Sequence, residues 1–276
     1  MAAAEGRVQA MRKLLQRGAD PNSINDTYGG VINAAIESGN CEAVELLVEN
    51  DVSLTSRESE VFEKLESLQE QREKDGVEGD AASDDNGRDG NGSDDNGNDD
   101  NESDTNESDN DEGEREIIWS PLAVAASRSD LTMFNFLLQK YSDKLPAEEF
   151  NAALVKAAEW GRLEAFKRLL REYRHPHQAL QDSLNQSTDE GCWDVVSLML
   201  EECKGLDCDE AFYNTCRGDE GQQKITLLEA MWEYTQGSIS TETVDRALYY
   251  ATDLEFADTV GLLLRFGANP NATGEE

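Results

Sequence analysis

One short phrase occurs near both ends of this 276-residue chain. Residues 18–22 read GADPN, and residues 267–271 read GANPN. Gly6 and Gly39 lie 33 positions apart, and each precedes a stretch that has apolar residues at helical spacing. A phrase that recurs together with the segments around it indicates that a structural unit recurs along the chain.

A second pair of segments has almost the same spacing. Ala125 and Ala126 align with Ala157 and Ala158 at an offset of 32, and the leucine pairs that follow them keep this offset. Each unit therefore contains an alanine-rich helical segment, a short turn and a second helical segment with paired leucines. A period near 33 with two helices per unit predicts an all-α solenoid of stacked helix–loop–helix units.

The residues around these helical segments suit the ends of helices. Ser120 can cap a helix through its hydroxyl, and Pro121 stands in the first turn, where a helix has no N–H bond to lose. Gly39 suits the turn between two helices, where a positive φ is often needed. Gly18 ends a second helix and Pro21 prevents it from continuing, so the repeated phrase is predicted to be an exit loop.

These motifs resemble those of ankyrin repeats. The stretch SPLAVAA at 120–126 is similar to the opening of an ankyrin helix pair, although Ala123 stands where that repeat usually has a histidine that ties neighbouring loops together. The stretch GADPNSINDTYGGVINAAIESGNCEAVELL at 18–47 resembles repeats of filamentous fungi, which often form the recognition part of NACHT-type signalling proteins. The resemblance implies a protein-binding scaffold without catalytic activity.

The resemblance covers two blocks of the chain. Residues 1–56 correspond to about two ankyrin units, and residues 117–276 correspond to about five. Two units of the second block, at 179–203 and 209–235, are degenerate, because they keep little of the motif that opens the first helix. About seven units are therefore expected, in an array that is interrupted between the two blocks.

The interruption has two parts of different composition. Residues 57–74 place four apolar residues at helical spacing among charged ones, which predicts a charged amphipathic helix. Residues 75–116 are dense in Asp, Asn, Gly and Ser and contain no apolar side chain larger than alanine except Val77. Such a segment cannot bury enough surface to offset the entropy of ordering, so a disordered acidic low-complexity insert is predicted.

Nearly half of the formal net charge of −35 lies in this insert, since residues 75–114 hold 17 acidic residues and one basic residue, Arg88. No basic patch is found in the sequence, so direct contact with nucleic acid or with an anionic membrane is not expected. The insert is interpreted either as a solubilising spacer or as an electrostatic binder of basic proteins. Ser108, which is followed by acidic residues, is a candidate phosphorylation site that would deepen the negative charge.

The sequence also indicates the cellular compartment in which the protein is expected. No apolar run approaches the roughly 18–20 residues that cross a bilayer, and the first residues contain no apolar core of a signal peptide. The five cysteines are odd in number and irregularly spaced, which favours free thiols in a reducing compartment. A cytoplasmic protein is therefore expected, with the nucleus as the alternative location.

The sequence gives little evidence for a catalytic or metal-binding site. His175 and His177 flank Pro176, but no further ligands follow at a zinc spacing, and an exposed loop between repeats is the preferred interpretation. The stretch GDEGQQKIT at 218–226 lacks the Gly-Lys-Ser/Thr ending of a phosphate loop. No nucleophile is identified beside a base, so no enzyme activity, no cofactor and no metal are expected.

The resemblance to ankyrin repeats places recognition on the hairpin tips and on the exposed face of the first helices. It implies seven partner-binding residues here: Thr27, Tyr28, Ile118, Trp119, Arg128, Lys156 and Trp160. The two tryptophans are of most interest because interface hot spots favour Trp and Arg, although either indole could instead fill a gap between helices.

Three hypotheses for function follow. The leading one is a monomeric, non-catalytic scaffold that binds a protein partner on the concave face of the array. The second is capture of basic proteins by the acidic insert, with the repeats as its support. The third is that the chain is the sensor fragment of a larger NACHT-type signalling protein.

Overall fold

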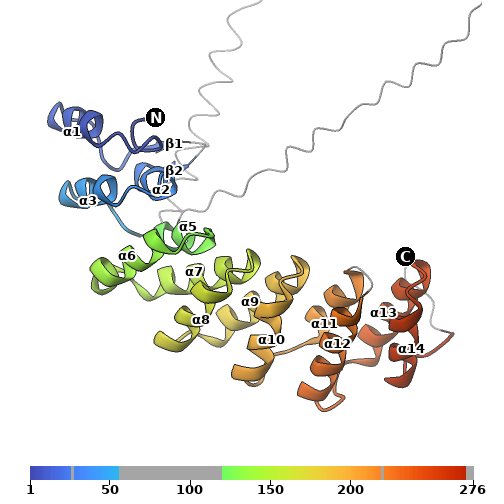
Figure 1. The fold of residues 1–276 in the computed structure, drawn as a ribbon. Helices are drawn as coiled ribbons and strands as arrows, with labels where there is room; N and C mark the ends of the chain where they lie inside the picture. The colour runs from blue at the N-terminus through green and yellow to red at the C-terminus, as the bar shows by residue number, and fades with distance from the viewer. Residues whose placement is uncertain (26–27, 56–119, 219–220, 272–276) are drawn as a thin grey trace, which may run out of the picture. The chain divides into compact units, whose positions relative to one another are not determined.

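Consecutive helices form pairs along the described parts of the chain, as the sequence period predicts (Figure 1). The computed structural model describes residues 1–25, 28–55, 120–218 and 221–271. The predicted amphipathic helix at 57–74 and the predicted acidic insert at 75–116 lie outside these residues.

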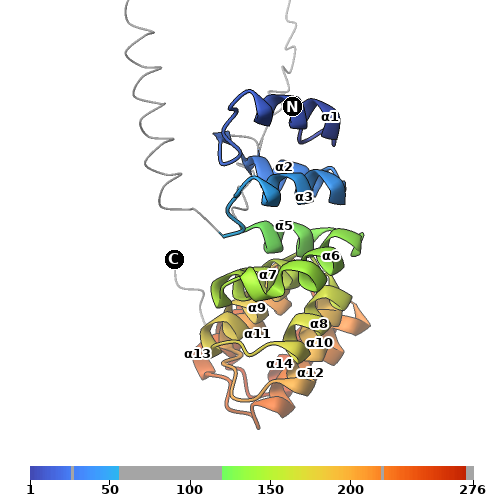
Figure 2. The ribbon, with the colours of Figure 1, turned by 90° about the vertical axis from the view of Figure 1, so that its left-hand side faces the viewer.

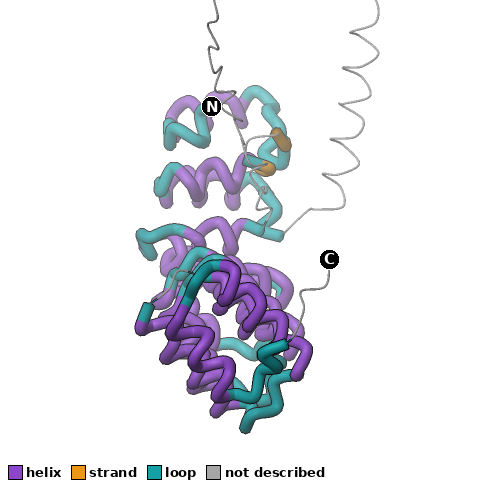
Figure 3. The backbone as a smooth tube through the Cα atoms, turned by 90° about the vertical axis from the view of Figure 1, so that its right-hand side faces the viewer, coloured by secondary structure: helices purple, strands orange, loops and turns teal. Residues whose placement is uncertain are grey.

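The described elements are a single helix α1, two short strands and six helix pairs. Helix α1 spans Val8–Gln16, and the strands β1 Ile24–Asn25 and β2 Gly29–Gly30 pair antiparallel between α1 and α2 (Figure 3). The helix pairs are α2 Val31–Glu37 with α3 Cys41–Glu49, α5 Pro121–Ser127 with α6 Thr132–Tyr141, α7 Ala147–Glu159 with α8 Leu163–Glu172, α9 His177–Asp189 with α10 Trp193–Glu202, α11 Asp209–Arg217 with α12 Gln222–Tyr234, and α13 Thr241–Asp253 with α14 Ala257–Arg265. A short 3-10 helix, η1 Ser142–Lys144, follows α6. None of the described helices is long and apolar enough to cross a bilayer.

The helices of successive pairs form two layers (Figure 2). Each first helix packs against the first helices of the neighbouring pairs, in the order α2, α5, α7, α9, α11 and α13. The second helices α8, α10, α12 and α14 contact one another in the same order. The prediction of an all-α array of stacked helix pairs is confirmed.

The first helices pack closely because small side chains face their neighbours. Ala125 and Ala126 in α5, and Ala157 and Ala158 in α7, are completely buried. An alanine loses no side-chain entropy on burial, and its methyl group lets two helix backbones approach each other closely. The alanine pairs of the sequence therefore mark the layer on which the stack is built.

Helix α9 uses hydroxyl residues where α5 and α7 use alanine. Ser183, Ser187 and Thr188 are buried, and their hydroxyls donate to carbonyls of the same helix at 2.7, 2.9 and 3.1 Å. A buried hydroxyl that is satisfied within its own helix needs no partner from a neighbouring repeat. The degenerate unit at 179–203 therefore still forms the helix pair α9–α10, and the one at 209–235 forms α11–α12.

Glycines in the left-handed conformation lie at the predicted turns. Gly39 and Gly161, between paired helices, have φ of +72° and +61°. Gly18 and Gly267, which begin the two matching exit loops, have φ of +87° and +94°. Glycine adopts this conformation without steric cost, so the repeated phrase marks a repeated exit from a second helix.

Side chains in the turns connect each of several repeats to the repeat before it. Four of them donate to a carbonyl at the end of the preceding first helix or turn: Asn40 to Gly6 at 2.9 Å, Arg128 to Glu37 at 2.7 Å, Arg162 to Ser127 at 2.6 Å, and Cys192 to Glu159 at 3.2 Å. The last carbonyls of a helix have no partner within that helix, and positive charge is favourable there. These bonds therefore stabilise the helix ends and the stacking of the repeats together.

Ser120 joins two repeats through a buried hydrogen bond. Its Oγ accepts from the N–H of Ala123 at 3.1 Å, which is the predicted cap of α5, and donates to the Glu149 carboxylate at 2.6 Å. Ser120 and Glu149 are both buried, and Pro121 holds the first helical position as predicted. A bond between neighbouring repeats is thus present even though Ala123 replaces the usual histidine.

Replacing Ser120 by alanine should destabilise the protein more than removing an exposed cap does. The substitution removes a helix cap, worth about 1 kcal/mol, and a hydrogen bond to a carboxylate, worth about 1.5–3 kcal/mol. Ser240 is the matched control, because it caps α13 in the same way at 3.1 Å and is exposed. The measurement is the free energy of unfolding of Ser120→Ala and of Ser240→Ala in urea. If both variants lose the same free energy of unfolding, the Ser120–Glu149 contact does not stabilise the protein.

Candidate functional site

Seven partner-binding residues and one phosphorylation site were predicted from the sequence, and four of these eight lie outside the described residues. They are Thr27, Ser108, Ile118 and Trp119. The other four belong to three different repeats and differ in how much of the side chain is exposed to a partner.

Tyr28 and Arg128 both contact other parts of the array. Tyr28 stands in the turn between β1 and β2 and is half-buried against the core. Arg128 follows α5, and its guanidinium donates to the Glu37 carbonyl of α2 at 2.7 Å. Because a cation at the end of a helix stabilises that end, the structure gives Arg128 a role in stacking.

Lys156 and Trp160 lie at the end of α7. The Nζ of Lys156 is 2.8 Å from the Glu159 carboxylate, and both side chains are largely buried. Trp160 is the C-cap residue of α7 and is 52% exposed. Of the two interpretations of Trp160, the structure therefore supports the exposed surface residue and not the residue that fills a gap.

A second group of side chains, which the sequence did not indicate, lies on α11 and α13. The guanidinium carbon of Arg246 lies 4.3 Å from the centre of the Tyr213 ring. The Tyr250 ring meets the Tyr213 ring edge-on, with 6.3 Å between the ring centres. Arg246 is exposed and the two tyrosines are half-buried. These three residues are called the Tyr–Arg cluster.

A hydrogen bond between side chains also joins α11 to the first helix before it, α9. The Nδ2 of Asn185 in α9 donates to the Glu210 carboxylate in α11 at 2.7 Å. We define the first-helix face as the Tyr–Arg cluster together with Trp160, Asn185 and Glu210. It combines tyrosine rings, an indole and an arginine, which are the side chains most enriched in interface hot spots, with the amide of Asn185 and the carboxylate of Glu210.

The Tyr–Arg cluster forms because two repeats stack in register, and no local sequence motif indicates it. Tyr213 belongs to a unit whose sequence is degenerate, and Tyr250 follows 37 positions later. The two rings meet only because α11 and α13 stack as neighbours. The one signal in the sequence was the tyrosine pair at 249–250, in a unit that resembles ankyrin repeats well.

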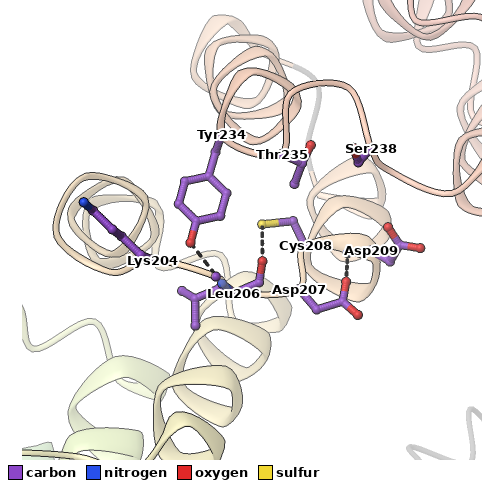
Figure 4. A pocket seen from close by; sticks show the side chains of 9 residues that line it. Lys204, Leu206, Asp207, Cys208, Asp209, Tyr234, Thr235 and Ser238 are labelled. Carbon is purple, nitrogen blue, oxygen red and sulfur yellow. Dashed lines mark hydrogen bonds between the residues drawn. The ribbon is translucent and has the colours of Figure 1, made fainter.

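A pocket of about 460 Å³ lies between the loops that follow α10 and α12 (Figure 4). The hydroxyl of Tyr234 accepts from the backbone N–H of Leu206 at its wall, at 3.0 Å. Burial, together with the nearby carboxylates of Asp207 and Asp209, raises the pKa of the Cys208 thiol to about 12. A thiol that stays protonated is a poor nucleophile and a poor metal ligand, so Cys208 gives this pocket no reactive group.

Lys224 lies in the stretch that superficially resembles a phosphate loop, and it has a structural role. It is buried, its Nζ donates to the Gly218 carbonyl at 3.0 Å, and it lies 3.7 Å from the centre of the Phe256 ring. A buried ammonium needs such partners because the loss of its hydration is costly. Lys224 therefore connects the start of α12 to the last repeat and does not face a ligand.

The two histidines are not arranged as the sequence predicted. Pro176 is the N-cap of α9, so His177 begins that helix and does not continue an extended loop. The Nε2 of His175 lies 3.0 Å from the Leu169 carbonyl, and its Nδ1 lies 2.9 Å from the side-chain Oδ1 of Asn151. The prediction of an exposed loop is wrong for His175, because its ring is half-buried between α7 and α8. Within the described ranges, no three metal-binding side chains gather in one place.

Comparisons with known proteins agree with this arrangement. The family model of the ankyrin repeat matches residues 1–26. A search of curated protein sequences returned no match. The crystal structure of the human ASB11 ankyrin repeat domain is similar, with a TM-score of 0.53 at 15% sequence identity, and the match covers 98% of this chain and 97% of that chain. The likeness shows the fold, and the predicted all-helical ankyrin-repeat array is confirmed.

Protonation of His175 should destabilise the folded protein. Burial holds the pKa of His175 below its usual value of 6.5, and the contact with the Leu169 carbonyl opposes this only in part. The unfolded chain therefore takes up the proton first as the pH falls. The contribution of neutral His175 to the stability of the folded protein is fully present above pH 6.5. It is lost as the pH falls through the lowered pKa of His175.

The measurement is the free energy of unfolding of the wild type and of His175→Gln between about pH 8 and about pH 5. The wild type should lose more stability than the glutamine variant over this range. Parallel curves for the two proteins would show that His175 does not titrate differently in the folded and unfolded states.

Proposed function

We propose that this array of ankyrin repeats is a non-catalytic scaffold that binds a protein partner on its first-helix face. The stacked repeats supply a rigid support, and exposed side chains on successive first helices supply recognition. The side chains that hold the stack are separate, because the alanines and hydroxyl residues of the same helices are buried. The exposed residues can therefore differ between such arrays without loss of the fold.

The Tyr–Arg cluster is the observation that carries this proposal. Arg246 is exposed, and its guanidinium is held over the Tyr213 ring at 4.3 Å. A side chain that is already held in place loses less entropy on binding than a mobile one. Trp160 adds a half-exposed indole at the end of α7.

Two further functions remain proposals from the sequence. The acidic residues at 75–116 would bind basic proteins by charge alone, and that binding would collapse at about a few hundred millimolar salt. The stretch at 18–47 would place the array in a fungal NACHT-type signalling protein, as its sensor. Binding at the first-helix face differs from charge capture because an interface built on aromatic rings largely survives added salt.

Substitutions in the Tyr–Arg cluster should weaken binding of the specific partner. Arg246→Ala removes the stacked guanidinium, and Tyr213→Ala removes its support. Each should lower the affinity about tenfold or more, because hot-spot residues contribute about 2 kcal/mol or more. The measurement is a titration of each purified variant with a partner that the wild type captures from native lysate.

Arg171→Ala is the matched control for these substitutions. Arg171 is also an exposed arginine, but it lies on α8 in the layer of second helices and pairs with Glu202. This variant should bind as the wild type does. Unchanged affinity in both cluster variants, at normal helical content, would contradict recognition at the first-helix face.

A further inference from the structure

The pocket between the loops that follow α10 and α12 combines negative charge, an aromatic ring and oxygen acceptors. Its volume of about 460 Å³ is in the range of ligand pockets, about 300–1,000 Å³. Asp207 and Asp209 border it from the first loop, and the Ser238 hydroxyl borders it from the second. The Tyr234 ring stands at its wall (Figure 4). These groups suit a ligand that is positively charged and rich in hydrogen-bond donors.

The two carboxylates are held in place by backbone N–H groups. Asp207 Oδ1 accepts from the N–H of Asp209 at 3.0 Å, and Asp209 Oδ1 accepts from the N–H of Ser240 at 3.1 Å. Over the described ranges of the chain, neither carboxylate forms an ion pair with a basic side chain. A side chain that is already oriented loses less entropy on binding than a mobile one, so both carboxylates are prepared to receive a cation.

The Cys208 thiol indicates the sign of the electric field in this pocket. Burial raises the pKa of Cys208, and Asp207 and Asp209 contribute in the same direction, because their negative charge disfavours a thiolate. The field that disfavours an anion favours a cation. Lys204 also borders the pocket, but its side chain extends away from the two aspartates (Figure 4). A cation from another molecule therefore meets opposite charge here.

The pocket lies next to the first-helix face. Asp209 and Tyr213 are four positions apart on α11, so their side chains share one side of that helix. Their separation along the helix axis is about 6 Å, which an extended peptide covers in about two residues. Arg246 already places a guanidinium over the Tyr213 ring, so a second cation is repelled at that ring. One segment of a partner can therefore place a cation in the pocket and an uncharged side chain on the Tyr–Arg cluster.

We propose that this pocket binds an arginine side chain of the protein partner. An apolar or aromatic residue about two positions away in the same extended segment then lies on the Tyr–Arg cluster. Arginine fits better than lysine because its five N–H donors match a pocket with several acceptors, and because its planar group stacks on a ring such as Tyr234. This inference rests on the proposed function, since it names a chemical property of the partner that the first-helix face binds.

The test is an NMR titration of the full-length chain with the peptide acetyl-Gly-Arg-Gly-Tyr-Gly-amide. The peptide should give saturable shifts of the backbone amide signals of the loops at 203–208 and 235–240. A matched peptide carries citrulline, which has the shape of arginine without its charge. It should bind about tenfold or more weakly, because a hydrogen bond to a charged group contributes more than a neutral one. A third peptide, with lysine in place of arginine, should also bind more weakly.

Asp207→Asn removes one charge from the pocket and keeps the oxygen that accepts from Asp209. It should weaken binding of the arginine peptide about tenfold or more. Asp130→Asn is the matched control, because Asp130 is also exposed and its Oδ1 accepts from the N–H of Thr132, two positions on, at 2.9 Å. Asp130 lies just before α6, in the layer of second helices. This control should bind the arginine peptide as the wild type does.

Four results would overturn the proposal. The absence of saturable shifts in the two loops would show that the pocket does not bind arginine. Equal affinity for the arginine and citrulline peptides would show that the charge is not recognised, and equal affinity for the lysine peptide would show that a guanidinium is not needed. Equal weakening in Asp207→Asn and Asp130→Asn would show general attraction to an acidic chain.

Failure of this inference can be distinguished from failure of the proposed function. If Arg246→Ala and Tyr213→Ala weaken partner binding and Asp207→Asn does not, the partner uses the first-helix face without the pocket, and only the assignment of arginine fails. If the arginine peptide binds the pocket but Arg246→Ala and Tyr213→Ala leave partner binding unchanged, the proposed function fails instead.

Discussion

Neighbouring first helices are in close contact, and this contact determines where the turns and the second helices lie. Ala126 and Ala158 are completely buried between these helices, and a larger side chain at such a position costs about 1–3 kcal/mol in strain. The short separation brings the turns of adjacent repeats within hydrogen-bonding reach, so that Arg162 can donate to the Ser127 carbonyl at 2.6 Å. The second helices follow the stacking of the first helices and add exposed ion pairs. These pairs contribute less to stability than the buried contacts do.

The features that were predicted from the sequence depend on single residues with unusual properties. Glycine is needed at a positive φ, as at Gly39, and a serine before a proline caps a helix, as Ser120 does. The burial of Glu149 and Lys224 could not be predicted, because Glu149 accepts from Ser120 and Lys224 lies over the Phe256 ring, and both partners come from other segments of the chain. The Tyr–Arg cluster was missed for the same reason, since its rings meet only after two repeats have stacked. His175 was misjudged because the sequence does not show which helices enclose a loop residue.

The array separates the side chains that hold it together from those that can bind another molecule. Alanines, and hydroxyl side chains that bond to carbonyls of their own helix, are buried in the first helices. Arg246 and Trp160, in contrast, are exposed. Substitutions on the first-helix face can therefore change recognition without disturbing the stack.

We assign recognition to the repeats and not to the acidic insert. The most direct measurement is a paired capture from native lysate with the whole chain and with a version that lacks residues 75–114, followed by mass spectrometry of the bound proteins. If the repeats carry recognition, both versions should recover the same specific partner. If all partners are basic proteins and are lost when residues 75–114 are removed, recognition belongs to the acidic residues and not to the repeats.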